Sequence, residues 1–150
     1  MKKAIIIPDS FKGTLSSIQI CAIVSECIRR VFPGCEVLEM PVADGGEGSV
    51  DAFLFAVGGE RVHVEATGPW FERRQSYYGL LTGDTAVIEM ASAAGLPLAG
   101  ARLDPELTTT YGVGELLLDA VHRGAKQVIV GLGGSATNDA GCGAAAAAGV

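Results

Sequence analysis

Short apolar runs that alternate with helical patterns constrain the fold of this chain most strongly. Residues 4–8 and 36–40 are two such runs, and the β-branched side chains of the first favour a buried strand. Each run is followed by a polar, glycine-rich turn and then by apolar residues at helical spacing. These helical patterns reach about Phe32 in the first case and span residues 49–57 in the second. Strand, helix, strand and helix with such short links predict the start of a parallel α/β sheet.

The middle of the chain has a different pattern. Residues 61–66 alternate apolar and polar side chains, and 73–81 and 86–90 are further strand candidates. Their short connections favour an antiparallel meander. We therefore expect an α/β domain over residues 1–60 and the beginning of a second α/β domain over residues 61–150.

The last third of the chain returns to the α/β pattern. Residues 107–123 predict a helix, 127–130 predict a buried strand, and 144–148 begin a helix of small residues. Because the pattern stops inside that helix, we expect the second domain to be incomplete at its C-terminal end. The expected fold class is α/β, with parallel-sheet units of the Rossmann or flavodoxin type and an antiparallel β meander.

The charge of the chain argues against several classes of partner. Its 150 residues carry a formal net charge of −6, and without a basic stripe they are a poor match for nucleic acid or an anionic membrane. No apolar run approaches the roughly 18 residues of a membrane-spanning helix. Four cysteines without CxxC spacing, of which Cys21 and Cys27 are expected to be buried free thiols, favour a reducing, cytoplasmic location.

Three polar, glycine-rich loops form the candidate site, because each follows a predicted strand. They span residues 9–14, 44–48 and 131–139. In open parallel sheets, ligands bind outside the carboxyl ends of the strands. If the three strands share a sheet, or face one another across two domains, the loops meet in one crevice.

The third loop is the most informative. Its glycines allow a sharp turn that directs several N–H groups to one point, and the helix after it adds a positive end, which predicts a nest for phosphate or carboxylate. Asp139 is a candidate to hold Mg²⁺ or to orient a substrate hydroxyl. The alternative is a tight turn in which a side chain only caps the helix. The candidate phosphate-binding residues are Gly133, Gly134, Ser135, Thr137 and Asn138.

The first loop offers one cation beside two polar side chains. Lys12 can neutralise a transferring phosphoryl group, and Asp9 and Ser10 are candidate substrate-binding residues. The alternative is a solvated lysine that pairs with Asp9.

The second loop places two carboxylates around three glycines. Asp44 and Glu47 match the one or two carboxylates that Mg²⁺ takes together with phosphate oxygens. Gly45 and Gly46 allow the backbone to approach a ligand closely. The alternative for Glu47 is that it only complements the start of the next helix.

A weaker signal points to a different activity. Residues 131–136 fit the GxGxxA pattern of dinucleotide-binding loops, but the acidic partner expected about 20 residues further on lies beyond the chain. An NAD-dependent oxidoreductase is therefore the alternative enzyme, and an inactive ligand-binding fragment is the alternative without catalysis.

Four segments occur in a combination that is specific, although each alone is not. They are PDSFKGTLS at 8–16, PVADGGEG at 41–48, AVIEMA at 86–91 and GLGGSATND at 131–139. In this order they resemble the type I glycerate kinases over essentially the whole chain. The resemblance implies a two-domain α/β kinase that depends on ATP and Mg²⁺ and phosphorylates D-glycerate, commonly to 2-phosphoglycerate.

Under this resemblance the three loops take on expected roles. Lys12, Asp44 and Asp139 are the expected catalytic residues, and Asp44, Glu47 and Asp139 are the expected Mg²⁺ ligands. The remaining candidates would bind the phosphate or the carboxylate of the substrate. Which carboxylate acts as base and which holds the metal stays open.

Overall fold

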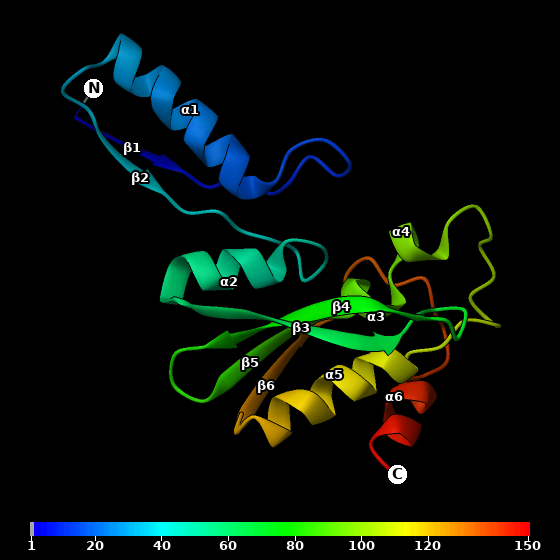
Figure 1. The fold of residues 1–150 in the computed structure, drawn as a ribbon. Helices are drawn as coiled ribbons and strands as arrows, with labels where there is room; N and C mark the ends of the chain where they lie inside the picture. Colours follow the sequence, from blue (N-terminus) through cyan, green and yellow to red (C-terminus); the bar gives the residue numbers. More distant parts are fainter. Residues whose placement is uncertain (1) are drawn as a thin grey trace.

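The computed structural model describes residues 2–150, which form two separate β-sheets (Figure 1). The first sheet pairs β1 (Lys3–Ile6) with β2 (Glu36–Glu39) in parallel, and α1 (Ser17–Val31) connects the two strands. The parallel α/β start predicted from the sequence is confirmed.

A strong cap starts α1, which covers one face of this small sheet. Ser16 Oγ accepts a hydrogen bond from Gln19 N at 3.2 Å, and Gln19 Oε1 accepts one from Ser16 N at 2.9 Å, forming a capping box. Ile6 is buried, but the paired Ile5 and Leu38 are 54% and 43% exposed. Within residues 2–150, the sheet face that carries Ile5 and Leu38 is therefore uncovered.

The second sheet has four strands in the order β3-β4-β5-β6. The strands are β3 (Gly59–Thr67), β4 (Arg73–Leu81), β5 (Thr85–Glu89) and β6 (Gln127–Gly131). The first three form an antiparallel meander, and β6 runs parallel to β5. The predicted meander and the predicted strand before the third loop are confirmed, and the fold class is α/β.

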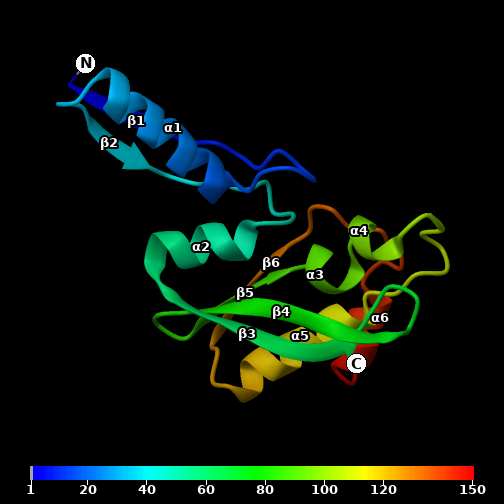
Figure 2. The same cartoon turned by 45° about the horizontal axis from the view of Figure 1, so that its top comes forward.

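Helices cover both faces of the second sheet (Figure 2). α2 (Ser49–Val57) lies on one face, and α3 (Ala91–Ala94) and α5 (Tyr111–His122) lie on the other, whereas α4 (Leu96–Ala99) packs against α3 and α6 (Cys142–Ala147) packs against α5. Successive residues of β5 show the two faces. Val87 packs with Val50 of α2, whereas Ile88 belongs to the larger core with Val113 and Leu116 of α5. No helix in residues 2–150 is long and apolar enough to cross a membrane.

Some details differ from the sequence expectations. The short helices α3 and α4 were not predicted, because four residues are too few to show a periodicity. α5 begins at Tyr111 and not near residue 107, because Thr108 is buried and its hydroxyl donates to the third loop. Cys21 is buried as expected, but Cys27 is exposed because α1 has only one covered face.

The packing of α2 bears on the domain division. By sequence this helix lies before residue 60, but Val50 packs into the second sheet against Val87. The packing therefore changes from one sheet to the other along residues 40–48, which include the second loop. The division near residue 60 stays a prediction.

Candidate active site

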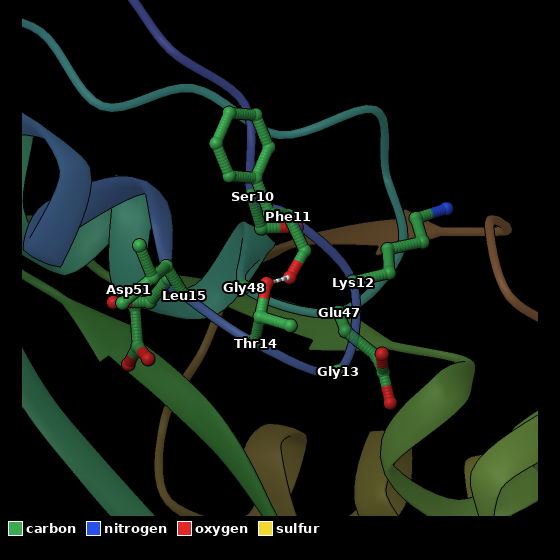
Figure 3. Close-up of a pocket in the computed structure, with 10 residues that line it drawn as sticks. Ser10, Phe11, Lys12, Gly13, Thr14, Leu15, Glu47, Gly48 and Asp51 are labelled. Atoms are coloured by element: carbon green, nitrogen blue, oxygen red, sulfur yellow. Dashed lines mark hydrogen bonds between the residues drawn. The ribbon is translucent and has the colours of Figure 1, made fainter.

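The first loop forms a tight turn between β1 and α1 (Figure 3). Phe11 and Leu15 exchange backbone hydrogen bonds of 2.9 and 3.1 Å, and Thr14 Oγ1 donates to Phe11 O at 2.8 Å. Gly13 has a φ of +79°, a backbone conformation that favours glycine. The turn holds Lys12 beside Gly13 with an exposed side chain.

The ammonium group of Lys12 lies against the second loop. Its Nζ atom is 3.3 Å from Asp44 Oδ2, whereas Asp9 Oδ1 accepts a hydrogen bond from Ser10 N at 2.6 Å. The alternative pairing of Lys12 with Asp9 is therefore wrong. Gly46 N donates to Asp44 Oδ1 at 3.0 Å, and this bond together with Lys12 holds the pKa of the Asp44 carboxyl below its usual range.

An open cavity of about 250 Å³ lies between the first loop and the start of α2. Residues 10–16 line one side of it, and Glu47, Gly48 and Asp51 line the other (Figure 3). The predicted residues Ser10, Lys12 and Glu47 thus share one cavity. Its mixed charge suits a small anion accompanied by a cation.

The second and third loops meet backbone to backbone. Gly133 N donates to Gly45 O at 2.9 Å. A Cβ atom at Gly133 would lie 2.5 Å from Gly46 N, and one at Gly131 would overlap Gly45 O. Glycine is required at these positions because the two loops approach so closely. The structure therefore brings all three loops together.

Four N–H groups of the third loop already have acceptors within the chain. The acceptors are backbone oxygens of neighbouring loops and the Ser135 hydroxyl, and the donors are Gly133, Ala136, Thr137 and Asn138. The loop also forms a β-bridge between Ser135 and Gly95. These four N–H groups are therefore already engaged within the chain, and a nest formed by the remaining N–H groups of the loop stays a prediction.

Asp139 joins the starts of two helices. Its carboxylate accepts hydrogen bonds from the backbone N–H groups of Thr110 (2.9 Å), Gly141 (3.0 Å) and Gly143 (3.1 Å), and the Thr110 hydroxyl lies 2.8 Å away. Partial burial raises the pKa of Asp139, but these hydrogen bonds outweigh it and hold the pKa below the usual range. Both oxygens are therefore occupied in stabilising α5 and α6.

Glu89 is the most buried acidic side chain of the site region, with 1% of its surface exposed. Its Oε1 accepts a hydrogen bond from Val50 N at 2.7 Å, and Tyr77 Oη donates to Oε2 at 3.2 Å. Burial raises the pKa of this carboxyl, although the two hydrogen bonds oppose the shift. In the sequence Glu89 is a single charge within the apolar run 86–91, a pattern that does not show whether the side chain lies at a sheet edge or in a cleft.

The surroundings of the GxGxxA segment do not match a dinucleotide-binding loop. In that motif the glycines turn directly into a helix whose start holds the pyrophosphate. Here α6 begins only at Cys142, and Gly133 is packed against Gly46. The oxidoreductase alternative has no support in this geometry.

Comparison with known proteins identifies the family. The sequence model of the glycerate kinase family matches residues 4–150. The chain belongs to the glycerate kinase family. It is 45% identical to "Glycerate 2-kinase" of Escherichia coli K12 over 143 residues, and 43% identical to "Glycerate kinase" of Bacillus cereus over 150 residues.

A solved glycerate kinase structure has the same fold. The crystal structure of a protein assigned as glycerate kinase 2, from Salmonella typhimurium LT2, superposes with a TM-score of 0.83 at 43% identity. The match covers 97% of this chain but 40% of the Salmonella chain. Likewise, the chain matches 94% of its own length to the E. coli protein but only 38% of that protein's length. The activity of a whole glycerate kinase is therefore a proposal for this chain.

Proposed function

We propose that this chain provides the phosphate-handling loops of an enzyme that transfers the γ-phosphoryl group of ATP to D-glycerate. The product would be phosphoglycerate, and the name of the E. coli relative favours 2-phosphoglycerate. The observation that carries the proposal is the contact of Lys12 with Asp44 beside a cavity. A kinase needs a positioned cation there because phosphoryl transfer depends mainly on positioning and charge neutralisation.

Lys12 has the geometry of a charge-neutralising group. Its side chain is 59% exposed, and within residues 2–150 its one acidic partner is Asp44, so its remaining N–H donors are free to meet phosphate oxygens. In the proposed reaction Lys12 binds the transferring phosphoryl group, while Asp44 orients the ammonium. Ser10 lines the same cavity and would donate its hydroxyl to the phosphate or to the glycerate carboxylate.

Two of the three candidate carboxylates suit Mg²⁺. Within residues 2–150, no three His, Cys, Asp or Glu side chains gather into a complete metal site, but Mg²⁺ in kinases takes one or two carboxylates and completes its shell with phosphate and water. Asp44 and Glu47 are exposed, and the lowered pKa of Asp44 keeps it ionised. Bound Mg²⁺ would offset the charge of the phosphates.

Asp139 does not suit the roles of ligand or base. Each of its oxygens accepts N–H groups from helix starts, and a lowered pKa makes a carboxylate a weaker proton acceptor. We therefore assign Asp139 to holding the third loop against α5. Gly133 supports the second loop in the same way.

We further propose a cytoplasmic enzyme, supported by four free cysteines.

The test is a coupled assay of ADP formation with ATP, Mg²⁺ and D-glycerate. It uses the chain joined to the part of the E. coli glycerate 2-kinase that the chain does not match, here called the extended enzyme. We expect ADP formation that requires D-glycerate and is much slower with L-glycerate. An extended enzyme that is folded and binds ATP, but forms no ADP with D-glycerate, would reject the proposal.

A further inference from the structure

The start of α2 lacks a cap of its own. Its N-cap residue is Gly48, in a left-handed conformation and without a side chain that could accept a hydrogen bond. The first N–H groups of a helix have no partner inside it, and Val50 is fully buried, so water cannot supply one. The acceptor is Glu89 Oε1 on β5, at 2.7 Å from Val50 N.

We propose that Glu89 is a positioning residue, which caps α2 from the neighbouring strand and thereby fixes the second loop beside the cavity. Its effect on turnover rests on the proposed function, whereas its effect on the loop does not. Glu89 does not itself line the cavity, although the backbone of Gly48, which does, also lies beside its carboxylate. It acts through α2.

A short series of contacts leads from the cap to the cavity. Ser49, next to the capped residue Val50, donates from its N–H (3.2 Å) and its hydroxyl (2.7 Å) to Gly46 O. Gly46 N in turn donates to Asp44 Oδ1, and Asp44 Oδ2 holds Lys12. Loss of the cap at the start of α2 would therefore loosen the ion pair between Lys12 and Asp44, which the proposed reaction uses.

The surroundings of Glu89 indicate that its carboxylate serves to hold α2 in position. It lies next to an apolar cluster formed by Val50, Val87 and Leu81, and a buried carboxylate costs free energy that an apolar side chain would not. The charged and titratable groups nearby are Tyr77 on β4, Arg61 on β3 and Asp51 on α2. Of these, Tyr77 donates directly to Glu89.

Two variants of similar size separate capping from packing. Glu89→Met removes the acceptor and fills the space, whereas Glu89→Gln keeps an oxygen that can accept from Val50 N. Leu81→Ala is the control, because it leaves a cavity in the cluster beside α2 without touching the cap. The measurement is amide hydrogen exchange of residues 44–50 in the chain itself, alongside the melting temperature.

We expect amide exchange of residues 44–50 to become at least tenfold faster in Glu89→Met and to stay within threefold of wild type in Glu89→Gln. Leu81→Ala should lower the melting temperature but leave exchange at 44–47 within threefold. Exchange in Glu89→Met within threefold of wild type, or equal acceleration in Glu89→Met and Glu89→Gln, would overturn the proposal.

Turnover of the extended enzyme gives a second measure. We expect Glu89→Met to lower kcat at least tenfold, and Glu89→Gln to restore it to within threefold of wild type. If the unaltered extended enzyme has no glycerate kinase activity, the proposed function fails, but the exchange measurement still decides the role of Glu89.

Discussion

The two sides of the candidate site use their polar groups in opposite ways. On the side of the first sheet, Lys12 and Asp44 are 59% and 51% exposed and keep hydrogen-bonding capacity free. On the side of the second sheet, Glu89 and Asp139 are bonded to N–H groups of helix starts. Groups with free capacity can meet a ligand, whereas satisfied groups hold the loops in place. Acidic residues that look alike in the sequence thus have different roles.

Replacing Lys12 tests the exposed side and should have the largest effect. We expect Lys12→Ala to lower kcat of the extended enzyme roughly 100- to 1,000-fold, since in the proposed reaction this charge neutralises the transferring phosphoryl group. Stability should hardly change, because exposed ion pairs contribute about 0–1 kcal/mol. Lys12→Arg, which keeps the charge, serves as the control. A Lys12→Ala enzyme with near-normal kcat would remove Lys12 from the mechanism.

Replacing Asp139 tests the satisfied side. We expect Asp139→Asn to lower the free energy of unfolding by about 2–3 kcal/mol at pH 7, because N–H groups of two helix starts lose a charged acceptor. The folded-state pKa of Asp139 lies below its unfolded value. Its stabilisation is therefore present above about pH 4 and is lost as the pH falls through the folded pKa.

Urea unfolding at neutral and acid pH measures this effect. The difference in the free energy of unfolding between wild type and Asp139→Asn should become smaller below about pH 4. Glu106→Gln, which neutralises an exposed carboxylate nearby, should leave stability within about 0.5 kcal/mol at both pH values. A difference in the free energy of unfolding that does not change with pH would mean that the charge of Asp139 does not stabilise the two helix starts.

Adding one methyl group tests the contact between the loops. Gly133→Ala places Cβ at 2.5 Å from Gly46 N, and we expect it to cost about 2 kcal/mol through displacement of the two loops. At Gly34 nothing lies within 4 Å of the new Cβ, so Gly34→Ala is the matched control and should be nearly neutral. Equal unfolding midpoints for Gly133→Ala and Gly34→Ala would show that the loops do not touch as described.

The smallest expected effect concerns the first sheet. Ser16→Ala removes the capping box of α1 and should cost about 1 kcal/mol, whereas Ser16→Asp keeps an acceptor and should recover most of it. Chemical denaturation followed by circular dichroism measures both variants. If Ser16→Asp is as unstable as Ser16→Ala, the side chain of Ser16 does not cap the helix.

The fold could be predicted well where one local pattern decides it. The helix at 49–57 and the meander of β3, β4 and β5 follow from helical spacing, terminal glycines and alternating strands. The partner of α2 could not be predicted, because its apolar side chains pack against Val87, which is distant in sequence. Helices of four residues, such as α3, leave no periodic signal at all.

The loops that form the candidate site could be predicted, but the hydrogen bonds among them could not. Glycine-rich turns after strands indicated that the three loops would meet. The sequence could not show that Gly133 N donates to Gly45 O, because a glycine that approaches a ligand and one that approaches another loop look the same. Likewise, the acceptor role of Asp139 depends on Thr110, 29 positions earlier.

A ligand footprint on the extended enzyme tests the division of roles most directly. Amide hydrogen exchange is compared with and without ADP, Mg²⁺ and D-glycerate. When the ligands are added, the account predicts slower amide exchange at residues 10–14 and 44–48. It predicts little change at 139–144, where Asp139 already accepts hydrogen bonds from N–H groups. Protection confined to residues 133–144, with none at 10–14, would contradict it.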